Sequence, residues 1–304
     1  MKKLILALAV VCLCASSQHA WACACGCGIF DVGTSSMFPG GAGGTAWLEY
    51  DYMNQSRNWS GTSRSPAAAN DDKDIRSSFY TAGAEYMFNR DWGVKMTVPY
   101  WDRHFTTDDG LGVQTFHHSS LGDVRLMGVY TGFSDDMSSG LLFGTKLPTG
   151  DYNSPSFDRD TALGTGSTDA LLGGYHMDRL TKDSKWSWFV QANIDVPVLV
   201  RGGYRPGSEV DAAIGTYYEG FSAFHGVRPV PVLQAIVSDR LRDSGPASDS
   251  PNSGYRRALI APGLELNFGR TMIYADAELP FYEDVNGNQL VAPASFKVVA
   301  SYHL

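Results

Sequence analysis

The chain has 304 residues, of which 43% are hydrophobic and 18% charged, and its net charge is −8. An acidic balance argues against nucleic-acid binding, which relies on basic patches. After the N-terminal region the sequence contains no run of about 18 apolar residues, the length that predicts a membrane-spanning helix.

The first 22 residues have the pattern of a secretory signal peptide. Lys2 and Lys3 precede an apolar run over residues 4–14, and the tract ends in Ala20-Trp21-Ala22, a small-x-small cleavage pattern. The apolar run is too short to cross a bilayer as a helix, which takes about 20 residues. Cleavage after Ala22 makes Cys23 the first mature residue, and loss of the two lysines changes the net charge from −8 to −10.

Long stretches of the mature chain alternate between apolar and polar residues with a period of two. The pattern holds over residues 45–53, 92–104, 186–201 and 271–284. In the first stretch one face carries Ala46, Leu48, Tyr50 and Tyr52, and the other carries Trp47, Glu49 and Asp51. An ordinary strand has about 5–6 residues, whereas a strand of an outer-membrane barrel alternates over about 10. An exported chain without a spanning helix is either soluble or a β-barrel, and this alternation favours the barrel.

A soluble β-sandwich also alternates and is the main alternative. Its strands are usually shorter, and its polar face is solvated. Here the polar face repeatedly carries full charges, which a water-filled or ion-paired lumen explains more directly.

The sequence predicts an all-β fold: an antiparallel transmembrane barrel of about twelve strands in an up-and-down meander. The expected strands are 45–57, 75–88, 92–105, 119–133, 138–148, 167–179, 185–201, 208–221, 227–240, 254–268, 271–284 and 293–304. Short connections alternate with longer polar ones, of which 58–74 is expected to be an exposed loop with nothing to bury. Short turns face the periplasm in such barrels, so both termini are placed there. Pro99, Pro148, Pro197, Pro231 and Pro280 are expected either to mark bulges or the ends of pairing near the outer rim, or merely to end strands.

Three ordered motifs carry a family resemblance: "SSLGDVRLMGVYTGF" at 119–133, "GLLFGTKLPTGDY" at 140–152 and "LGTGSTDALLGGY" at 163–175. Over roughly residues 75–304 the chain resembles the outer-membrane barrels named for the meta-cleavage pathway of phenol degradation. The resemblance implies a channel or transporter in the Gram-negative outer membrane, for aromatic or other small hydrophobic compounds, with no catalytic residues. The last strand departs from the usual barrel ending, because Leu304 stands where an aromatic residue is common.

Charged residues on the predicted inner face are candidates for a permeation path. Twelve strands lie between the filled eight-stranded barrel and the open porin of 16 to 18 strands, so a small solute can pass but a folded protein cannot. The alternative is a set of ion pairs that braces the wall, since charges in a narrow lumen pair readily. The candidates are Glu49, Asp51, Glu85, Lys95, Arg103, Asp195, Arg201, Arg257, Glu265, Asp276 and Glu278.

The segment 23–44 is predicted to be a Cys/Gly-rich leader, with the barrel following at 45–304. Cys23, Cys25 and Cys27 are the only cysteines of the mature chain. Four interpretations stay open: lipidation of Cys23, a disulfide or redox pair, a soft metal ion such as Cu(I) or Zn(II), and attachment of a periplasmic redox or metal-handling partner. Disulfide or redox chemistry ranks first and metal binding second.

The rest of the leader is either a disordered segment or a small lumen plug with Phe30, Met37 and Phe38 as anchors. His117 and His118 are placed in a loop. Because adjacent side chains diverge in extended chain, they are interpreted as solvated histidines rather than a metal site.

Three function classes follow from these observations. The first is an outer-membrane channel that passes small molecules, with the lipid bilayer and the solute as its partners. The second is a scaffold for a periplasmic redox or metal-handling protein, recruited by the cysteines. An enzyme in the barrel wall would need a Ser–His pair on one face, and since no such pair stands out, the chain is not expected to be an enzyme.

Overall fold

The computed structural model describes residues 38–39, 41–108, 110, 112–155, 157–180 and 185–304. This part of the chain contains fifteen strands and two short 3-10 helices, η2 (Ala67–Ala69) and η3 (Ser250–Asn252). The strands are β1 (Gly43–Gln55), β2 (Arg57–Gly61), β3 (Ser63–Arg64), β4 (Asp72–Met87), β5 (Trp92–Asp108), β6 (Val113–Leu121), β7 (Val124–Tyr130), β8 (Ser139–Leu147), β9 (Ser167–Arg179), β10 (Trp186–Val200), β11 (Glu209–Tyr218), β12 (Arg228–Arg240), β13 (Tyr255–Phe268), β14 (Thr271–Val291) and β15 (Ser295–His303). None of the described helices is long and apolar enough to cross a membrane.

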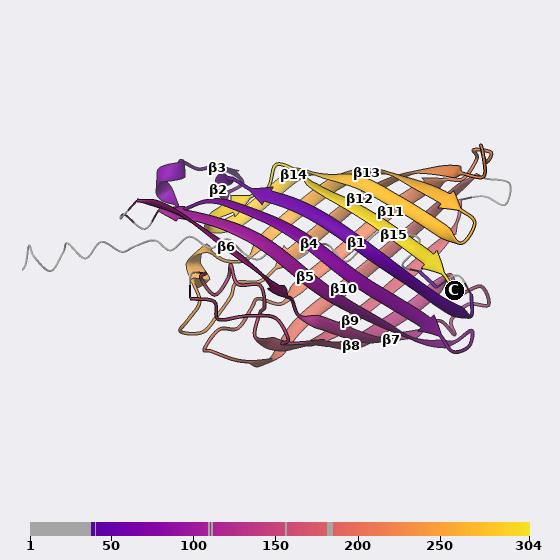
Figure 1. Cartoon of the computed structure of the whole chain (residues 1–304), viewed down its shortest axis with the longest axis horizontal. Helices are drawn as coiled ribbons and strands as arrows, with labels where there is room; N and C mark the ends of the chain where they lie inside the picture. The colour runs from indigo at the N-terminus through magenta and orange to yellow at the C-terminus, as the bar shows by residue number, and fades with distance from the viewer. Residues whose placement is uncertain (1–37, 40, 109, 111, 156, 181–184) are drawn as a thin grey trace, which may run out of the picture.

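The strands form a closed antiparallel barrel, as the alternation predicts (Figure 1). Each wall strand pairs with its neighbour in the chain, and β1 pairs with β15 from Thr45↔His303 to Met53↔Ser295 to close the ring. β6 and β7 both pair with β5, one after the other along its length, and so count as a single strand of the wall. β2 and β3 form a small hairpin beyond the wall and do not count toward it. Fifteen strands therefore give twelve wall positions, the number that the sequence predicts.

The two ends of the barrel differ in the length of their connections. At the turn end lie the C-terminus and short links such as residues 88–91 and 269–270. At the loop end lie residues 148–166, 201–208 and 241–254. Because short turns face the periplasm in outer-membrane barrels, we assign the loop end to the outside.

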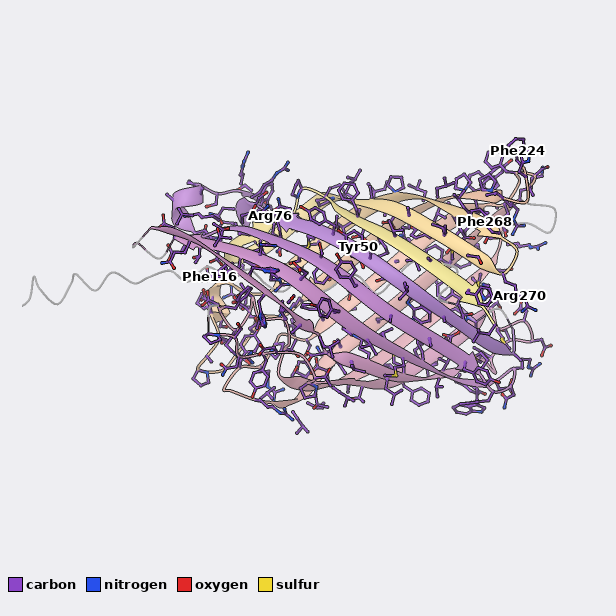
Figure 2. All side chains as sticks on the ribbon, in the orientation of Figure 1. Tyr50, Arg76, Phe116, Phe224, Phe268 and Arg270 are labelled. Atoms are coloured by element: carbon purple, nitrogen blue, oxygen red, sulfur yellow. The ribbon has the colours of Figure 1, made fainter. Side chains whose placement is uncertain are left out.

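Successive residues of each wall strand point alternately into and out of the barrel. In β5, Lys95 and Thr97 are buried inside, whereas Val94 and Met96 are exposed on the outside. The outward faces are apolar and end in aromatic residues, many of whose side chains Figure 2 shows projecting from the ribbon. This is the distribution expected when the outer face meets hydrocarbon and the inner face meets polar partners.

Aromatic residues mark two levels on the outer surface. The ring centroids of Trp92 and Tyr130 lie 4.7 Å apart near the turn end. Those of Tyr50 and Tyr80 lie 5.1 Å apart toward the loop end. Tyr100 pairs with Tyr80 and follows Trp92 by eight residues in β5. Eight residues span about 26 Å along a strand, or about 20 Å along the barrel axis at a tilt of about 40°. The two levels thus match the interfacial girdles of a membrane barrel.

Prolines lie where strand pairing is interrupted, as expected, but not always near the outer rim. The pairing of β9 with β10 shifts at Pro197, and that of β13 with β14 shifts next to Pro280. Pro99 lies where β5 changes its partner from β7 to β6. Pro231 contradicts the prediction of an outer position, because it lies near the turn end, just before the pairing of β12 with β11 begins at Val232.

The prediction of a loop is wrong for two segments. Residues 106–118 are mostly strand, because β5 and β6 continue past the aromatic level as a hairpin, which places His117 in β6 rather than in a loop. Residues 285–292 are also mostly strand, because β14 extends to Val291 and pairs with β2. The segment 58–74 consequently folds onto the wall and buries Asn58, Asn70 and Asp72, where an exposed loop with nothing to bury was expected.

The inside–outside assignment generates the first prediction. Replacing the exposed Met96 with Arg puts a charge on the hydrocarbon-facing side, and we expect a loss of about 2–4 kcal/mol in the free energy of unfolding in lipid vesicles. The matched variant Thr97→Arg places the same side chain in the lumen, one residue further on, and is expected to cost less. Denaturant titration read by heat-modifiable gel mobility measures both, and a larger loss for Thr97→Arg would reverse the two faces.

Candidate functional site

The centre of the lumen carries a group of acidic residues around one lysine. Nζ of Lys297, on β15, lies 3.7 Å from a carboxylate oxygen of Glu49 and 3.6 Å from one of Asp51, both on β1. Asp276 of β14 is the backbone partner of Lys297, and Glu278 follows two residues later on the same face. All five side chains are buried. One ammonium group thus lies among four acidic side chains and offsets part of their mutual repulsion.

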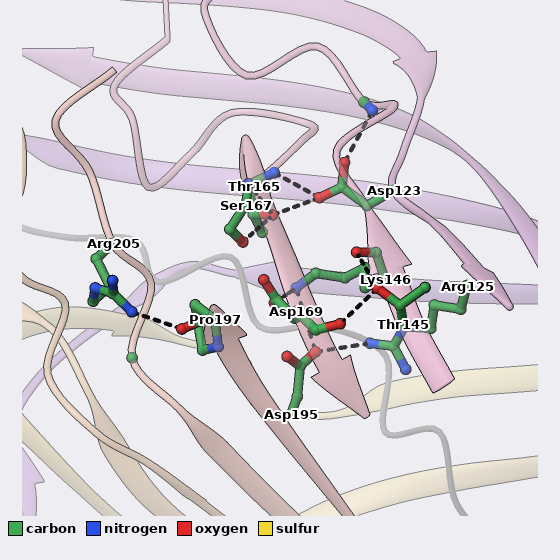
Figure 3. A network of polar contacts seen from close by, with 12 residues as sticks. Asp123, Arg125, Thr145, Lys146, Thr165, Ser167, Asp169, Asp195, Pro197 and Arg205 are labelled. Carbon is green, nitrogen blue, oxygen red and sulfur yellow. Dashed lines mark hydrogen bonds and ion pairs between the residues drawn. The ribbon is translucent and has the colours of Figure 1, made fainter. Parts of the chain in front are cut away.

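A second cluster lies on β7 to β10 (Figure 3). Lys146 contacts the carboxylate of Asp169 and lies 3.3 Å from that of Asp195, while a guanidinium nitrogen of Arg125 lies 3.8 Å from Asp195. The four residues come from four consecutive wall strands and all point inward. Here two cations face two anions, so the cluster is close to neutral and can brace the wall.

Most of the predicted inner-face charges are buried or half-buried on inward positions. Glu85 and Lys95 are direct cross-strand partners, and Lys95 also lies over the ring of Trp47 at 5.3 Å. Nε of Arg257 lies 3.0 Å from Glu283, and Glu265 accepts a hydrogen bond from Asn267 at 2.8 Å. The inward residues are Glu49, Asp51, Glu85, Lys95, Arg103, Asp195, Arg257, Glu265, Asp276 and Glu278.

Arg201 contradicts its predicted place on the inner face of a strand. It is exposed and follows the last residue of β10, Val200. The register shift at Pro197 interrupts the alternation that placed Arg201 in phase with Asp195. In these outermost residues the period of two therefore no longer indicates which side of the wall a residue faces.

At the turn end an apolar cluster lies inside the barrel. Its members come from strands all around the wall, and Phe38 of the leader packs among them, with its ring 4.6 Å from that of Tyr175 and 5.8 Å from that of Phe189. Phe38 thus occupies the inner position that the plug interpretation gives it, whereas Phe30, Met37 and the three cysteines lie outside the described residues. The predicted metal or redox role of Cys23, Cys25 and Cys27 stays a prediction.

Glycines on the inner face make room for the lumen aromatics. A Cβ atom on Gly83 would lie 2.1 Å from the ring of Trp47, its direct cross-strand partner, and one on Gly215 would lie 2.3 Å from Phe189. A larger residue at either glycine would push the ring toward the barrel axis. These pairs let flat rings lie along the wall of a narrow barrel.

At the loop end the segment 148–166 folds inward over the lumen. Asp123 holds it by accepting hydrogen bonds from the backbone N–H of Gly150 at 2.9 Å and of Thr165 at 2.8 Å. Arg103, on the inner face of β5, donates to the carbonyl of Thr161 at 2.6 Å. Phe157 packs against Phe105, with ring centroids 5.7 Å apart. The segment is thereby tied to the wall at several points and buries Leu163 completely.

Between the apolar cluster at the turn end and the segment 148–166 at the loop end lies a cavity of about 120 Å³. Its lining combines aromatic surface from Trp47 and Trp101 with the charged groups of Glu49, Arg125 and Asp195. Residues 206–207 of the loop end also contribute. The cavity therefore offers both an apolar wall and polar partners to a small solute.

Sequence reasoning missed Lys146, Asp169 and Lys297, although the signal was present. Lys297 lies between Phe296 and Val298, two outward residues, so the same period of two that located Asp195 also locates Lys297. Asp123 carried no such signal. It lies in the short break between β6 and β7, and its role depends on contacts with a loop 27 to 42 residues away.

The structure also brings together a serine and a histidine. Oγ of Ser139 and Nδ1 of His176 lie 2.8 Å apart on neighbouring strands β8 and β9, and His176 meets the edge of Trp188. Within the described part of the chain no hydrogen bond joins a carboxylate to His176. Within the described residues the pair therefore lacks the orienting acid of a catalytic triad.

Acidic groups gather where the segment 148–166 meets the outermost end of β4. Asp72 is buried, and its pKa is raised to about 8, first by burial and then by the charges of Asp160 and Asp158. Burial also raises the pKa of Asp158, with a further contribution from Asp249. Closing this end of the barrel therefore favours protonated carboxyl groups.

The second prediction concerns the stability cost of removing the positive charge of Lys297. Lys297→Met keeps a similar volume but leaves Glu49 and Asp51 buried without their cation, and we expect a loss of about 3–5 kcal/mol in the free energy of unfolding. The control is Arg256→Met, which breaks the exposed pair with Asp239 and is expected to cost about 0–1 kcal/mol. Equal losses in the two variants would contradict the central role of Lys297.

The third prediction concerns the pH dependence that Asp72 gives to the loop end. The raised pKa of this residue means that the closed loop end binds a proton more tightly than the open one, so closure should weaken as pH rises from about 4 to about 8 and level off above that. Hydrogen exchange of residues 148–155 and 157–166, corrected for intrinsic rates, should show more opening at the top of this range. In Asp72→Asn this pH dependence should shrink. An unchanged dependence would assign the effect to other groups.

Comparison with known proteins supports the fold. No family model and no curated protein sequence matches the chain. Among solved structures, the COG4313 outer membrane channel from Pseudomonas putida F1 superposes with a TM-score of 0.67 at 12% identity, over 90% of this chain and 99% of that one. The β domain of the Bordetella autotransporter BrkA gives a TM-score of 0.52 at 14% identity, over 86% and 100%. The chain therefore has the fold of the outer-membrane β-barrels.

Proposed function

We propose that the protein is an outer-membrane channel for small molecules that combine an aromatic or apolar body with a polar group. The cavity between the apolar cluster and the segment 148–166 carries this proposal. Its volume of about 120 Å³ is close to that of an engineered protein cavity of about 150 Å³ that binds benzene. A single aromatic ring is therefore the size of solute that the cavity suits.

The lining of the cavity supports the same class of solute. Trp47, Pro99 and Trp101 offer apolar surface, and Arg125, Asp195 and Glu49 lie on the same cavity wall. A purely hydrocarbon solute would leave these charged groups without a new partner, whereas a phenol-like solute can bond them. The solved COG4313 structure is described as an outer membrane channel, and the family resemblance of residues 119–175 implies aromatic or other small hydrophobic compounds.

The proposed transport is a gated one, because side chains and a loop segment lie in the path at both ends. Phe38 contributes to the closure at the turn end, and the segment 148–166 covers the loop end. A solute has to displace both on its way. Removing Phe38 should therefore open the path at the turn end without changing the wall.

The fourth prediction tests this function in planar bilayers with the purified full-length protein. Phe38→Ala should carry a larger single-channel current than the unmodified protein, because it removes an aromatic side chain from the lumen. The control Phe296→Ala removes an exposed ring from the outer face of β15 and should leave the current unchanged. Added phenol should reduce the current in a saturable way, and Trp101→Ala should weaken that block.

Two outcomes would overturn different parts of the proposal. If neither the unmodified protein nor Phe38→Ala carries current above the empty bilayer, the channel is wrong. If both carry current and phenol leaves it unchanged at every concentration, the channel stands and the aromatic solute class is wrong.

A further inference from the structure

Two histidines and an aspartate meet on the outer face of the hairpin that β5 and β6 form beyond the aromatic level. Asp102 and His104 are two residues apart in β5 and so point to the same side. His117 in β6 is the direct cross-strand partner of His104. His118, the next residue, points to the inner side and hydrogen-bonds Asp151 at 2.9 Å. The adjacent histidines diverge as expected, and the partner of His117 is a histidine 13 residues earlier in the chain.

The polar atoms of the three side chains already lie close together. Nε2 of His117 lies 3.2 Å from one carboxylate oxygen of Asp102, and Nε2 of His104 lies 3.7 Å from the other. The two imidazole rings stack with their centroids 4.3 Å apart and their planes 13° from parallel. One ligand atom from each residue falls within 4.8 Å of the other two.

The two separations between the histidines and the carboxylate are close to those of a coordination sphere. Zinc bonds to nitrogen and oxygen ligands are about 2.0–2.2 Å long, so two ligands of a tetrahedral ion lie about 3.4 Å apart. The observed 3.2 Å and 3.7 Å bracket this value. Small side-chain rotations would bring the three atoms around one ion, because all three residues are at least partly exposed and none is held in a packed core.

The donor set selects the type of ion. Imidazole nitrogens suit Zn, Cu, Ni and Fe, whereas Ca²⁺ and Mg²⁺ prefer oxygen ligands alone. A single carboxylate with two neutral imidazoles leaves a net charge of +1 on a divalent site, which an exposed position tolerates. Three protein ligands also leave a fourth place for water or another donor.

The charged residue that flanks the site on β4, Arg76, does not block it. Arg76 of β4 is the cross-strand partner of His104, on the side away from His117. Its guanidinium Nε lies 2.8 Å from a carboxylate oxygen of Asp74, which offsets its charge. Figure 2 shows Arg76 toward the loop end of the barrel. Tyr100 lies two residues before Asp102 on the same face, so the site begins just beyond the membrane interface.

We propose that Asp102, His104 and His117 form a binding site for a late divalent transition-metal ion, such as Zn²⁺ or Cu²⁺, on the outer surface. The site bridges β5 and β6. Within the described residues β6 pairs with no strand other than β5, so an ion there adds a second connection to a strand held on one side. The inner face of β6 contacts the segment 148–166 through His118, whose ring lies 5.9 Å from that of Phe157. Metal binding therefore stiffens the support of the loop that covers the lumen.

The fifth prediction tests the site by calorimetric titration of Zn²⁺ into the purified full-length protein in detergent. The background is Cys23/Cys25/Cys27→Ser and carries no polyhistidine tag, so that neither the leader thiols nor a tag supplies ligands. One ion should bind per chain, and excess Ca²⁺ should not displace it. Loss of even an outer-shell partner costs about 10–100-fold in metal affinity, so His104→Ala/His117→Ala should weaken binding by about 100-fold or more.

The matched control is His118→Gln, which changes the adjacent histidine on the opposite face and should keep the affinity. Copper titrated into the same background should give an electron paramagnetic resonance spectrum with nitrogen couplings from two imidazoles, a readout that does not depend on the variants folding. Zinc affinity that is unchanged in the double variant, or a copper spectrum without nitrogen couplings, would overturn the proposal.

Discussion

The pairing of β1 with β15 is the constraint on which the rest of the structure depends. In hydrocarbon a backbone N–H or C=O without a partner costs several kcal/mol, so a sheet in the membrane must have no edge. Nine residue pairs, from Thr45↔His303 to Met53↔Ser295, remove the two edges that a meander would otherwise leave. Once the ring is closed, every second residue of each strand faces a narrow interior. Buried charges, aromatic rings that lie along the wall, and the segment 148–166 are different ways of filling that interior.

The lumen changes in character along its length, and the change follows the chemistry of the inward residues. Near the turn end they are apolar and pack around Phe38. In the middle they are charged, and Lys297 offsets the carboxylates of Glu49 and Asp51. Toward the loop end the backbone of residues 148–166 itself supplies the partners, as Arg103 and Asp123 show. Under the proposed function, a solute would meet apolar surface, charge and amide groups in turn, which suits a molecule that carries both an apolar body and a polar group.

Sequence patterns predicted the wall of the barrel far better than its ends. The period of two is set by the strand itself, so it located twelve wall strands and the inward positions of residues such as Lys95 and Asp276. It failed at Arg201, where the bulge at Pro197 breaks the alternation. It also failed for residues 106–118, because polar residues such as His117 form a strand there through pairing with β5. Contacts that join distant segments, such as Asp123 with Thr165 or Arg103 with Thr161, leave no periodic trace in the sequence.

The closing seam also sets the order in which the barrel can be made. All other paired wall strands are joined by connections of fewer than about 20 residues, but Thr45 and His303 are 258 residues apart. Each doubling of a closed loop adds about 0.6 kcal/mol of entropy cost, so closing this seam costs about 3–4 kcal/mol more than closing a hairpin turn. The first strand made must therefore wait, with its edge unpaired, until the last strand has left the ribosome and crossed the inner membrane. During that interval the chain cannot enter lipid alone, and its safe delivery depends on whatever shields the edge of β1.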